Sequence, residues 1–110
     1  MVRARIPIHR HEDDLWKTGL ATVQLPSGRH IPVAAARPDA SLENLIETMM
    51  GEALYSLEKN GQRGISDPIE WEIVVNDVPY CYRCVQPMAR IDRPDSQWWE
   101  CAVCHTRLQL

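Results

Sequence analysis

The sequence predicts an α+β protein in which a small β-sheet and one long amphipathic helix pack against a compact C-terminal unit. Three observations predict this class. Segments with strand-like alternation flank residues 42–57, where apolar residues recur with helical periodicity. All four cysteines follow residue 80, in two Cys-x-x-Cys pairs. The 110 residues suffice for one domain or two very small ones. We place the boundary between an α+β module, residues 1–78, and a cysteine-bearing unit, residues 79–110.

The N-terminal segment is expected to form a short strand. Residues 2–6 alternate between apolar and polar side chains, and Pro7, which lacks an N–H group, predicts that this strand lies at an edge of the sheet. His9 and His11 would share one face of an extended chain, and with Glu12 they could hold a metal. A polar surface turn is the alternative interpretation of these histidines.

Residues 18–36 are expected to form a β-hairpin. The turn cluster at residues 26–29 contains Gly28, which can adopt a positive φ. Pro32 lies in the returning strand, and its missing donor predicts that this strand has a free edge.

The next element is predicted to be a helix of about five turns. Asp39 or Ser41 is suited to be its N-cap, and Gly61 is suited to the left-handed position after its last turn. Its apolar stripe consists of Leu42, Leu45, Ile46, Met49, Ala53, Leu54 and Leu57. Its outward face carries the acidic residues Glu43, Glu47, Glu52 and Glu58.

A loop over residues 62–68 is expected to lead into a strand at residues 69–75. The alternation there predicts that Ile69, Trp71, Ile73 and Val75 face the core. The connection from this strand to Cys81 is too short to be a flexible linker, so the C-terminal unit should be held rigidly against the rest.

The cysteine pattern predicts a metal site with the ligands Cys81, Cys84, Cys101 and Cys104. Sixteen residues separate the two pairs, which lies within the spacing typical of zinc sites. Each pair can aim two sulfurs at one point, and four thiolates form the tetrahedron that Zn²⁺ prefers in closed structural sites.

Three other roles compete with structural zinc for the four cysteines. A redox dithiol at one pair is disfavoured because two pairs occur together at zinc spacing. Iron in place of zinc would make the protein an electron carrier. His105 completes a Cys-x-x-Cys-His sequence, which is typical of c-type haem attachment, but that role would leave Cys81 and Cys84 without a function. His105 is better interpreted as a residue beside the site, or as a competing ligand.

Residues 80–110 resemble a zinc ribbon, also called a rubredoxin-like four-cysteine site. The resemblance rests on the order of a cysteine turn, a hairpin at residues 85–100 with its tip at residues 92–96, a second cysteine turn and a last strand at residues 105–110. It implies a structural Zn²⁺ ion.

A second resemblance lies upstream. Residues 22–33, with their glycine turn, precede a helix that begins at Pro38-Asp39-Ala40-Ser41, which looks like the opening of a ubiquitin-like β-grasp domain. The resemblance implies that residues 69–76 form the next strand of the same sheet. The chain has no di-glycine C-terminus, so conjugation is not implied.

The charge distribution disfavours a general role in nucleic-acid binding. The net charge of −3 divides into +2 for residues 1–40, −6 for residues 41–78 and +1 for residues 79–110. An acidic middle would repel a phosphate backbone. No apolar run is long enough to span a membrane, and no signal peptide is recognised, so we expect a soluble, cytoplasmic protein.

The expected function is that of a small non-catalytic adaptor or regulator that binds another protein. No catalytic motif is recognised, and no small-molecule substrate is inferred. Trp98 and Trp99 should point to opposite faces of a strand, so one of them is expected to contact a partner or to cover the other side of the ribbon. The candidate partner-binding residues are Glu43, Glu47, Arg90, Arg93, Trp98 and Trp99.

Two alternatives remain at this point. The ribbon could bind nucleic acid through its arginines and aromatic residues. It could instead serve as an electron-transfer or accessory subunit of an enzyme complex.

Overall fold

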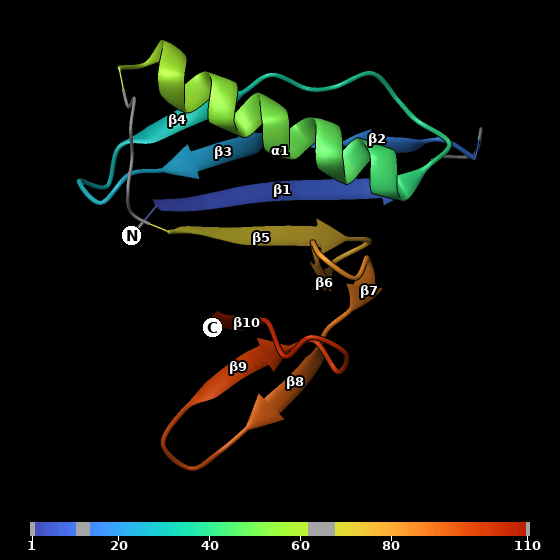
Figure 1. The fold of residues 1–110 in the computed structure, drawn as a ribbon, viewed down its shortest axis with the longest axis vertical. Helices are drawn as coiled ribbons and strands as arrows, with labels where there is room; N and C mark the ends of the chain where they lie inside the picture. The colour runs from blue at the N-terminus through green and yellow to red at the C-terminus, as the bar shows by residue number, and fades with distance from the viewer. Residues whose placement is uncertain (1, 11–13, 62–67, 110) are drawn as a thin grey trace.

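The computed structural model describes residues 2–10, 14–61 and 68–109. It is a mixed β-sheet covered on one face by a helix, with a second, smaller sheet below it (Figure 1). The elements are β1 (Val2–Arg10), β2 (Trp16–Thr18), β3 (Ala21–Gln24), β4 (His30–Val33), α1 (Leu42–Lys59), β5 (Ile69–Val75), β6 (Val78–Cys81), β7 (Gln86–Pro87), β8 (Ala89–Asp92), β9 (Gln97–Glu100) and β10 (Arg107–Gln109). The structure therefore confirms the α+β class and the predicted order of hairpin, helix and strand.

Strand β1 lies in the middle of the larger sheet, so the prediction that it forms an edge is wrong. The strand order is β4-β3-β1-β5-β6-β7, and β2 pairs with the end of β1. β1 runs parallel to β5 and antiparallel to β2 and β3. Its buried side chains alternate along the strand, as expected for a sheet with one face on the core: Val2, Ala4, Ile6 and Ile8.

Pro7 fits this central strand because the neighbouring chain bulges opposite it. β1 pairs with β3 up to Arg5 and with β2 from Ile8 onward, and the partner chain has one residue more over this interval. The Pro7 carbonyl accepts the Gly19 N–H at 2.9 Å, so the missing donor of Pro7 also faces the bulge. Leu20, at the bulge, is 82% exposed.

The hairpin of β3 and β4 matches its prediction. Gly28 has a φ of 90°, and Leu25 closes the turn by donating its N–H to the Arg29 carbonyl at 2.9 Å. β4 is the outermost strand, which confirms the free edge predicted from Pro32. Because hydrogen-bonded pairs alternate along the hairpin from Leu25–Arg29, the nitrogen of Pro32 points away from β3.

Helix α1 begins and ends where the sequence predicts. Ser41 is the N-cap, and its hydroxyl accepts the Asn44 N–H at 3.2 Å. Gly61 follows the helix with a φ of 80°. The face on the sheet buries Leu45, Ile46, Met49, Ala53 and Leu57. Leu54 was expected in this stripe but is 50% exposed. It is not among the helix residues that are buried against the sheet.

Strand β5 presents its predicted face to the core. Ile73 and Val75 are buried, and Ile69 and Trp71 are half-buried against the same cluster. The opposite face carries acids that pair with arginines of β1 in the parallel register, through the ion pairs Arg3–Glu70 and Arg5–Glu72.

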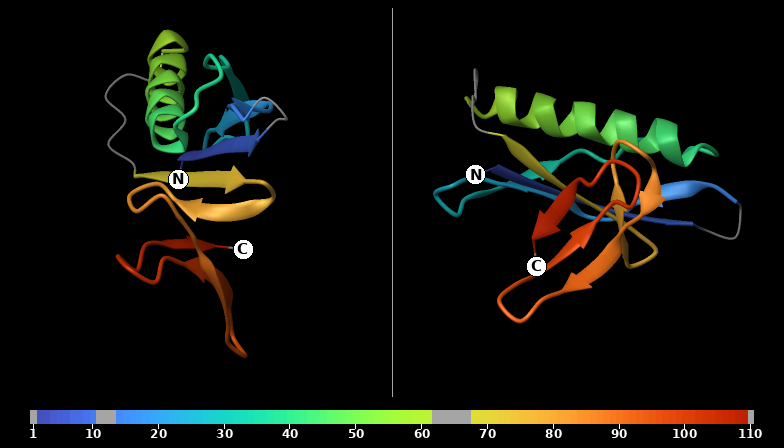
Figure 2. Two further views of the ribbon diagram at one scale, coloured as in Figure 1. Left: turned by 90° about the vertical axis from the view of Figure 1, so that its right-hand side faces the viewer. Right: turned by 60° about the horizontal axis from the view of Figure 1, so that its bottom comes forward.

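The C-terminal segment belongs to both sheets. β6 and β7 extend the larger sheet beyond β5, whereas β8, β9 and β10 form the smaller one (Figure 2). The predicted boundary between residues 78 and 79 thus falls inside β6. The chain changes sheets at Met88, which is buried and donates its N–H to the Pro79 carbonyl at 2.9 Å. The strand expected across residues 85–91 is therefore split in two.

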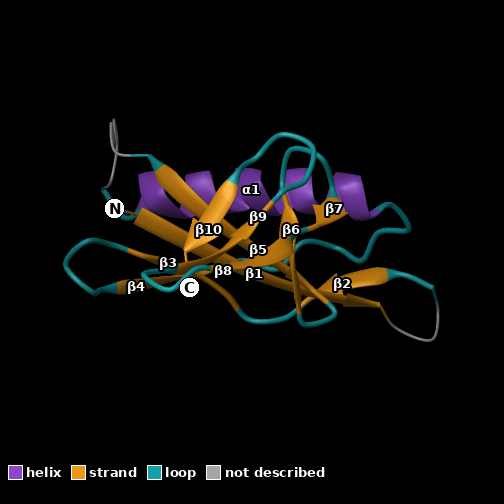
Figure 3. Ribbon diagram, turned by 90° about the horizontal axis from the view of Figure 1, so that it is seen from below, coloured by secondary structure: helices purple, strands orange, loops and turns teal. Residues whose placement is uncertain are grey.

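Viewed from below, α1 lies along one face of the larger sheet, and the described residues place no helix on its other face (Figure 3). Within the described residues, no helix is long and apolar enough to cross a membrane. Residues 62–67 of the predicted loop and the last residue of the predicted C-terminal strand, Leu110, lie outside the described residues.

Candidate metal centre

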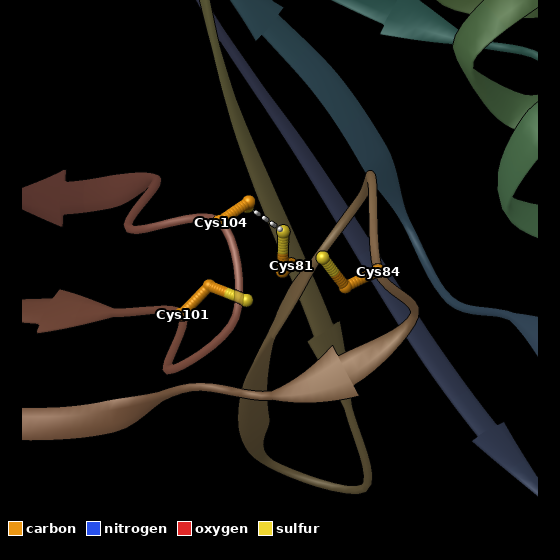
Figure 4. A group of neighbouring side chains, drawn as sticks. All are labelled: Cys81, Cys84, Cys101 and Cys104. Atoms are coloured by element: carbon orange, nitrogen blue, oxygen red, sulfur yellow. Dashed lines mark hydrogen bonds between the residues drawn. The ribbon is translucent and has the colours of Figure 1, made fainter.

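The four predicted cysteines converge at the junction of the two sheets (Figure 4). Their sulfur atoms all lie within 4.8 Å of one another, and those of Cys81 and Cys104 are 3.5 Å apart. A disulfide would require about 2.05 Å. Four sulfurs around Zn²⁺ at about 2.3 Å would be separated by about 3.8 Å from one another. The cluster therefore has the dimensions of a tetrahedral metal site.

The two cysteine pairs form the same backbone turn. The Cys81 carbonyl accepts the Val85 N–H at 2.9 Å, and the Cys101 carbonyl accepts the His105 N–H at 2.9 Å. Val85 and His105 both have positive φ values, 52° and 62°. Such a φ is uncommon for a residue with a side chain and is an outlier for a β-branched residue such as Val85. Both cysteine turns adopt this strained conformation.

This turn directs backbone N–H groups at sulfur. The backbone N–H groups of Cys104 and Val103 lower the pKa of Cys101 by hydrogen bonding to its sulfur. In the first turn, burial raises the pKa of Cys81, although the N–H groups of Cys84 and Arg83 oppose this effect. Hydrogen bonds to the charged form favour a thiolate, which is the form that binds metal.

The second cysteines of the two pairs differ in their electrostatics. Thr106 lies with its hydroxyl 3.0 Å from the Cys104 sulfur and lowers the pKa of Cys104 to about 6. The neighbouring sulfurs of Cys104 and Cys101 raise the pKa of Cys84 to about 12. Four thiols this close cannot all ionise unless a cation compensates the charge. A bound metal ion would supply that compensation.

The site is closed on one side and open on the other. Cys81 and Cys101 are fully buried, Cys84 is half-buried and Cys104 is exposed. A small apolar cluster covers the buried side, formed by the two buried cysteines with Met88, Leu108 and Trp99. Since four protein ligands fill a tetrahedron, such a site has no free position for substrate.

Glu100 organises the side chains next to the second cysteine turn. Its Oε1 accepts hydrogen bonds from the Trp98 indole N–H at 3.1 Å and from Arg107 Nε at 2.9 Å. Its Oε2 lies 3.5 Å from Nδ1 of His105. The Trp98 N–H is the main reason that the pKa of Glu100 lies below its usual value. Sequence reasoning missed Glu100 and Thr106, because neither belongs to a motif.

The two tryptophans lie on opposite sides of the small sheet, as predicted. Trp99 packs on the cysteine cluster, so it contributes to the structural core. Trp98 is half-buried on the other side, where the Arg107 guanidinium lies 4.6 Å from the centroid of its ring. Both tryptophans keep part of their surface accessible.

The remaining candidate residues fall at two separate places. Arg90 and Arg93 are exposed towards the tip of the small sheet, where Arg90 contacts Asp92 at 3.1 Å. Glu43 and Glu47 are exposed on the first half of α1 and face the first cysteine turn.

Among the described residues, no histidine is brought into the cysteine cluster. His9 lies on β1 opposite Lys17 of β2, while His11 and Glu12 lie outside the described residues. His105 contacts Glu100 rather than the four sulfurs.

The fold and this site define an α+β protein with a four-cysteine cluster that could hold a metal ion. Comparison with protein families, with curated proteins and with solved structures found no match. The resemblances to a zinc ribbon and to a β-grasp domain therefore rest on this chain alone.

Proposed function

We propose that this protein is a small, non-catalytic adaptor or regulator of the cytoplasm. In this proposal its C-terminal zinc ribbon is structural, and Zn²⁺ is bound by Cys81, Cys84, Cys101 and Cys104. The observation that carries the proposal is that the two cysteine pairs come from different sheets. The first pair lies at the end of β6 and in the turn to β7, both in the larger sheet, and the second pair joins β9 to β10 of the smaller sheet. A metal held there would fasten one sheet to the other.

A fastening role suits the size of the apolar cluster around the site. It contains four buried residues: Cys81, Met88, Cys101 and Leu108. So small a core cannot hold a separate three-stranded sheet, and small units of this kind depend on a metal or a disulfide for stability. Binding of the metal would then be part of the folding free energy.

An adaptor role is favoured over nucleic-acid binding because two of the ribbon's four arginines already have acidic partners. Arg90 contacts Asp92, and Arg107 contacts Glu100 at 2.9 Å. A phosphate would have to compete with these carboxylates. The protein also carries a net charge of −3. Both features favour a protein partner, with Trp98 as one contact.

Affinity capture from a lysate, with and without nuclease, tests this proposal when the purified protein is loaded with Zn²⁺. We expect about one zinc per chain and a defined protein partner that remains after nuclease treatment. Loss of all captured material on nuclease treatment would favour the nucleic-acid alternative. Iron with visible absorbance would favour electron transfer.

The test variants are Trp98→Ala and Arg93→Ala, which change half-buried or exposed residues outside the cysteine cluster. If the ribbon contacts the partner, at least one of these variants should capture less of it while retaining the metal. If neither variant changes the capture, the contact lies on another surface.

A further inference from the structure

We propose that a hollow between α1 and the first cysteine turn binds a lysine or arginine side chain of a partner protein. This inference rests on the proposed adaptor function and names the chemistry of one contact. The hollow has a volume of about 210 Å³. Its walls are residues 43–50 of the helix on one side and residues 82–85 of the cysteine turn on the other.

The hollow combines an apolar lining with acidic groups. Ile46, Met50 and Val85 supply aliphatic and thioether surface, while Glu43 and Glu47 supply carboxylates. Met50 and Val85 are half-buried, so their surface remains accessible. Lysine and arginine match this combination, because they carry a charged group on an apolar stem.

The two glutamates lack cationic partners in the part of the chain that the structure describes. They lie four residues apart on one helix face, where like charges destabilise the helix. The one basic residue of α1 is Lys59, in the last turn. Neither Glu43 nor Glu47 forms an ion pair with a described residue, and a cation from a partner would relieve their repulsion.

The aromatic wall of the hollow is already in contact with a cation. The guanidinium of Arg83 lies 5.5 Å from the centroid of the Tyr82 ring, and its Nε donates to the Tyr82 hydroxyl at 3.0 Å. The ring of Trp71 contacts Tyr82 with a separation of 6.3 Å between centroids. The aromatic residue is therefore braced against the sheet, and it holds Arg83 on its ring, so Arg83 forms no ion pair with Glu43 or Glu47.

The charge of the hollow favours a basic side chain over an acidic or a neutral apolar one. An acidic side chain would be repelled by Glu43 and Glu47, and residues 41–78 carry a net charge of −6. Arg83 also lines the hollow, so a neutral apolar side chain would leave two carboxylates there against one guanidinium. A basic side chain satisfies both parts of the hollow.

An NMR titration tests the proposal without knowledge of the partner. The probe is Nα-acetyl-arginine-methylamide, and the matched neutral probe is Nα-acetyl-norleucine-methylamide, added to zinc-loaded protein with labelled methionine methyl groups. We expect the Met50 methyl to shift with the arginine probe, with a Kd on the order of millimolar as for a small fragment. The shift should weaken at high salt, because the acids are exposed. The norleucine probe should produce a much smaller shift.

The double variant Glu43→Gln/Glu47→Gln should weaken arginine binding by about threefold to thirtyfold. Glu52→Gln is the control for loss of a negative charge elsewhere on the helix, since Glu52 lines a different hollow, beside Pro32 and Tyr55. The proposal is wrong if Met50 does not shift, or if the double variant binds arginine as well as the wild type.

The outcomes separate this inference from the adaptor proposal. A protein partner captured equally by the wild type and the double variant, with no arginine-induced shift, would overturn the hollow and leave the adaptor role standing. Arginine binding that depends on the two glutamates supports the hollow even if capture yields no protein.

Discussion

Val85 and His105 occupy the same position in two copies of one turn, each with a positive φ and each hydrogen-bonded to the cysteine carbonyl four residues before it. Glycine adopts this conformation without steric cost, whereas a β-branched side chain is strained there. The residue type at these positions should therefore control the stability of the site.

His105 gives the cleaner test, because Val85 also packs on the main core. His105→Val should destabilise the zinc-loaded protein by about 1–2 kcal/mol, while His105→Gly should be neutral or slightly stabilising. Urea unfolding followed by tryptophan fluorescence measures both. Gln97→Val is the control, since it places the same side chain on an exposed, extended strand. Equal stabilities for His105→Val and the wild type would contradict the importance of the turn geometry.

Removal of the metal should unfold the small sheet before the large one. The larger sheet and α1 share an extensive buried core, whereas the cluster that joins the smaller sheet to the larger one has four buried residues. After chelation, or in Cys84→Ser, amide NMR signals of residues 89–109 should lose their dispersion. Signals of β1 and β3 should remain dispersed, and Zn²⁺ should restore the wild-type spectrum. Persistent dispersion in residues 89–109 after complete chelation would show that the metal is not structural.

Trp98 and Arg107 should be energetically coupled, because the guanidinium lies against the indole ring and both groups bond to Glu100. A double-mutant cycle with Trp98→Leu and Arg107→Gln should give a coupling of about 0.5–1 kcal/mol in the free energy of unfolding. The pair Trp98 and Arg90 serves as the control and should be additive within about 0.5 kcal/mol. Additivity of Trp98 and Arg107 would mean that the stacked geometry contributes nothing.

The parallel pairing of β1 with β5 can be tested by exchanging charges. Glu70 is 13% exposed and is paired with Arg3 across the two strands. Glu70→Arg should destabilise the protein by about 1 kcal/mol or more, because it opposes two cations on neighbouring strands. Arg3→Glu in the same chain should recover part of this loss, whereas Arg5→Glu should recover less. If Arg5→Glu is the better rescue, the register of the pairing is different.

Local signals explain what the sequence could predict. Ser41, the apolar stripe and Gly61 specify α1 within a single stretch of chain, and the hairpin depends on Gly28 and its neighbours. The cysteine cluster was predictable because the ligand spacing reflects the geometry of the metal itself. In each case the prediction depends on a short segment of chain or on the number and spacing of the ligands that a metal site needs.

Long-range pairing explains what the sequence could not predict. Pro7 signals an edge strand, yet a bulge at Gly19 and Leu20 supplies the unpaired position that proline needs. The hollow brings Glu47 next to Tyr82, 35 positions further along the chain, and no local pattern encodes that contact. The role of Glu100 likewise depends on side chains that meet only after the small sheet has formed.

The outward nitrogen of Pro32 bears on how copies of the protein behave when they are concentrated. An exposed sheet edge is a template on which a strand from another molecule can add, and this leads to fibrils or domain-swapped aggregates. At β4 such a strand would find no donor at Pro32, so its ladder would be interrupted after a few residues. The proline ring at this one position thereby protects the outermost strand of the larger sheet against edge-to-edge pairing between molecules.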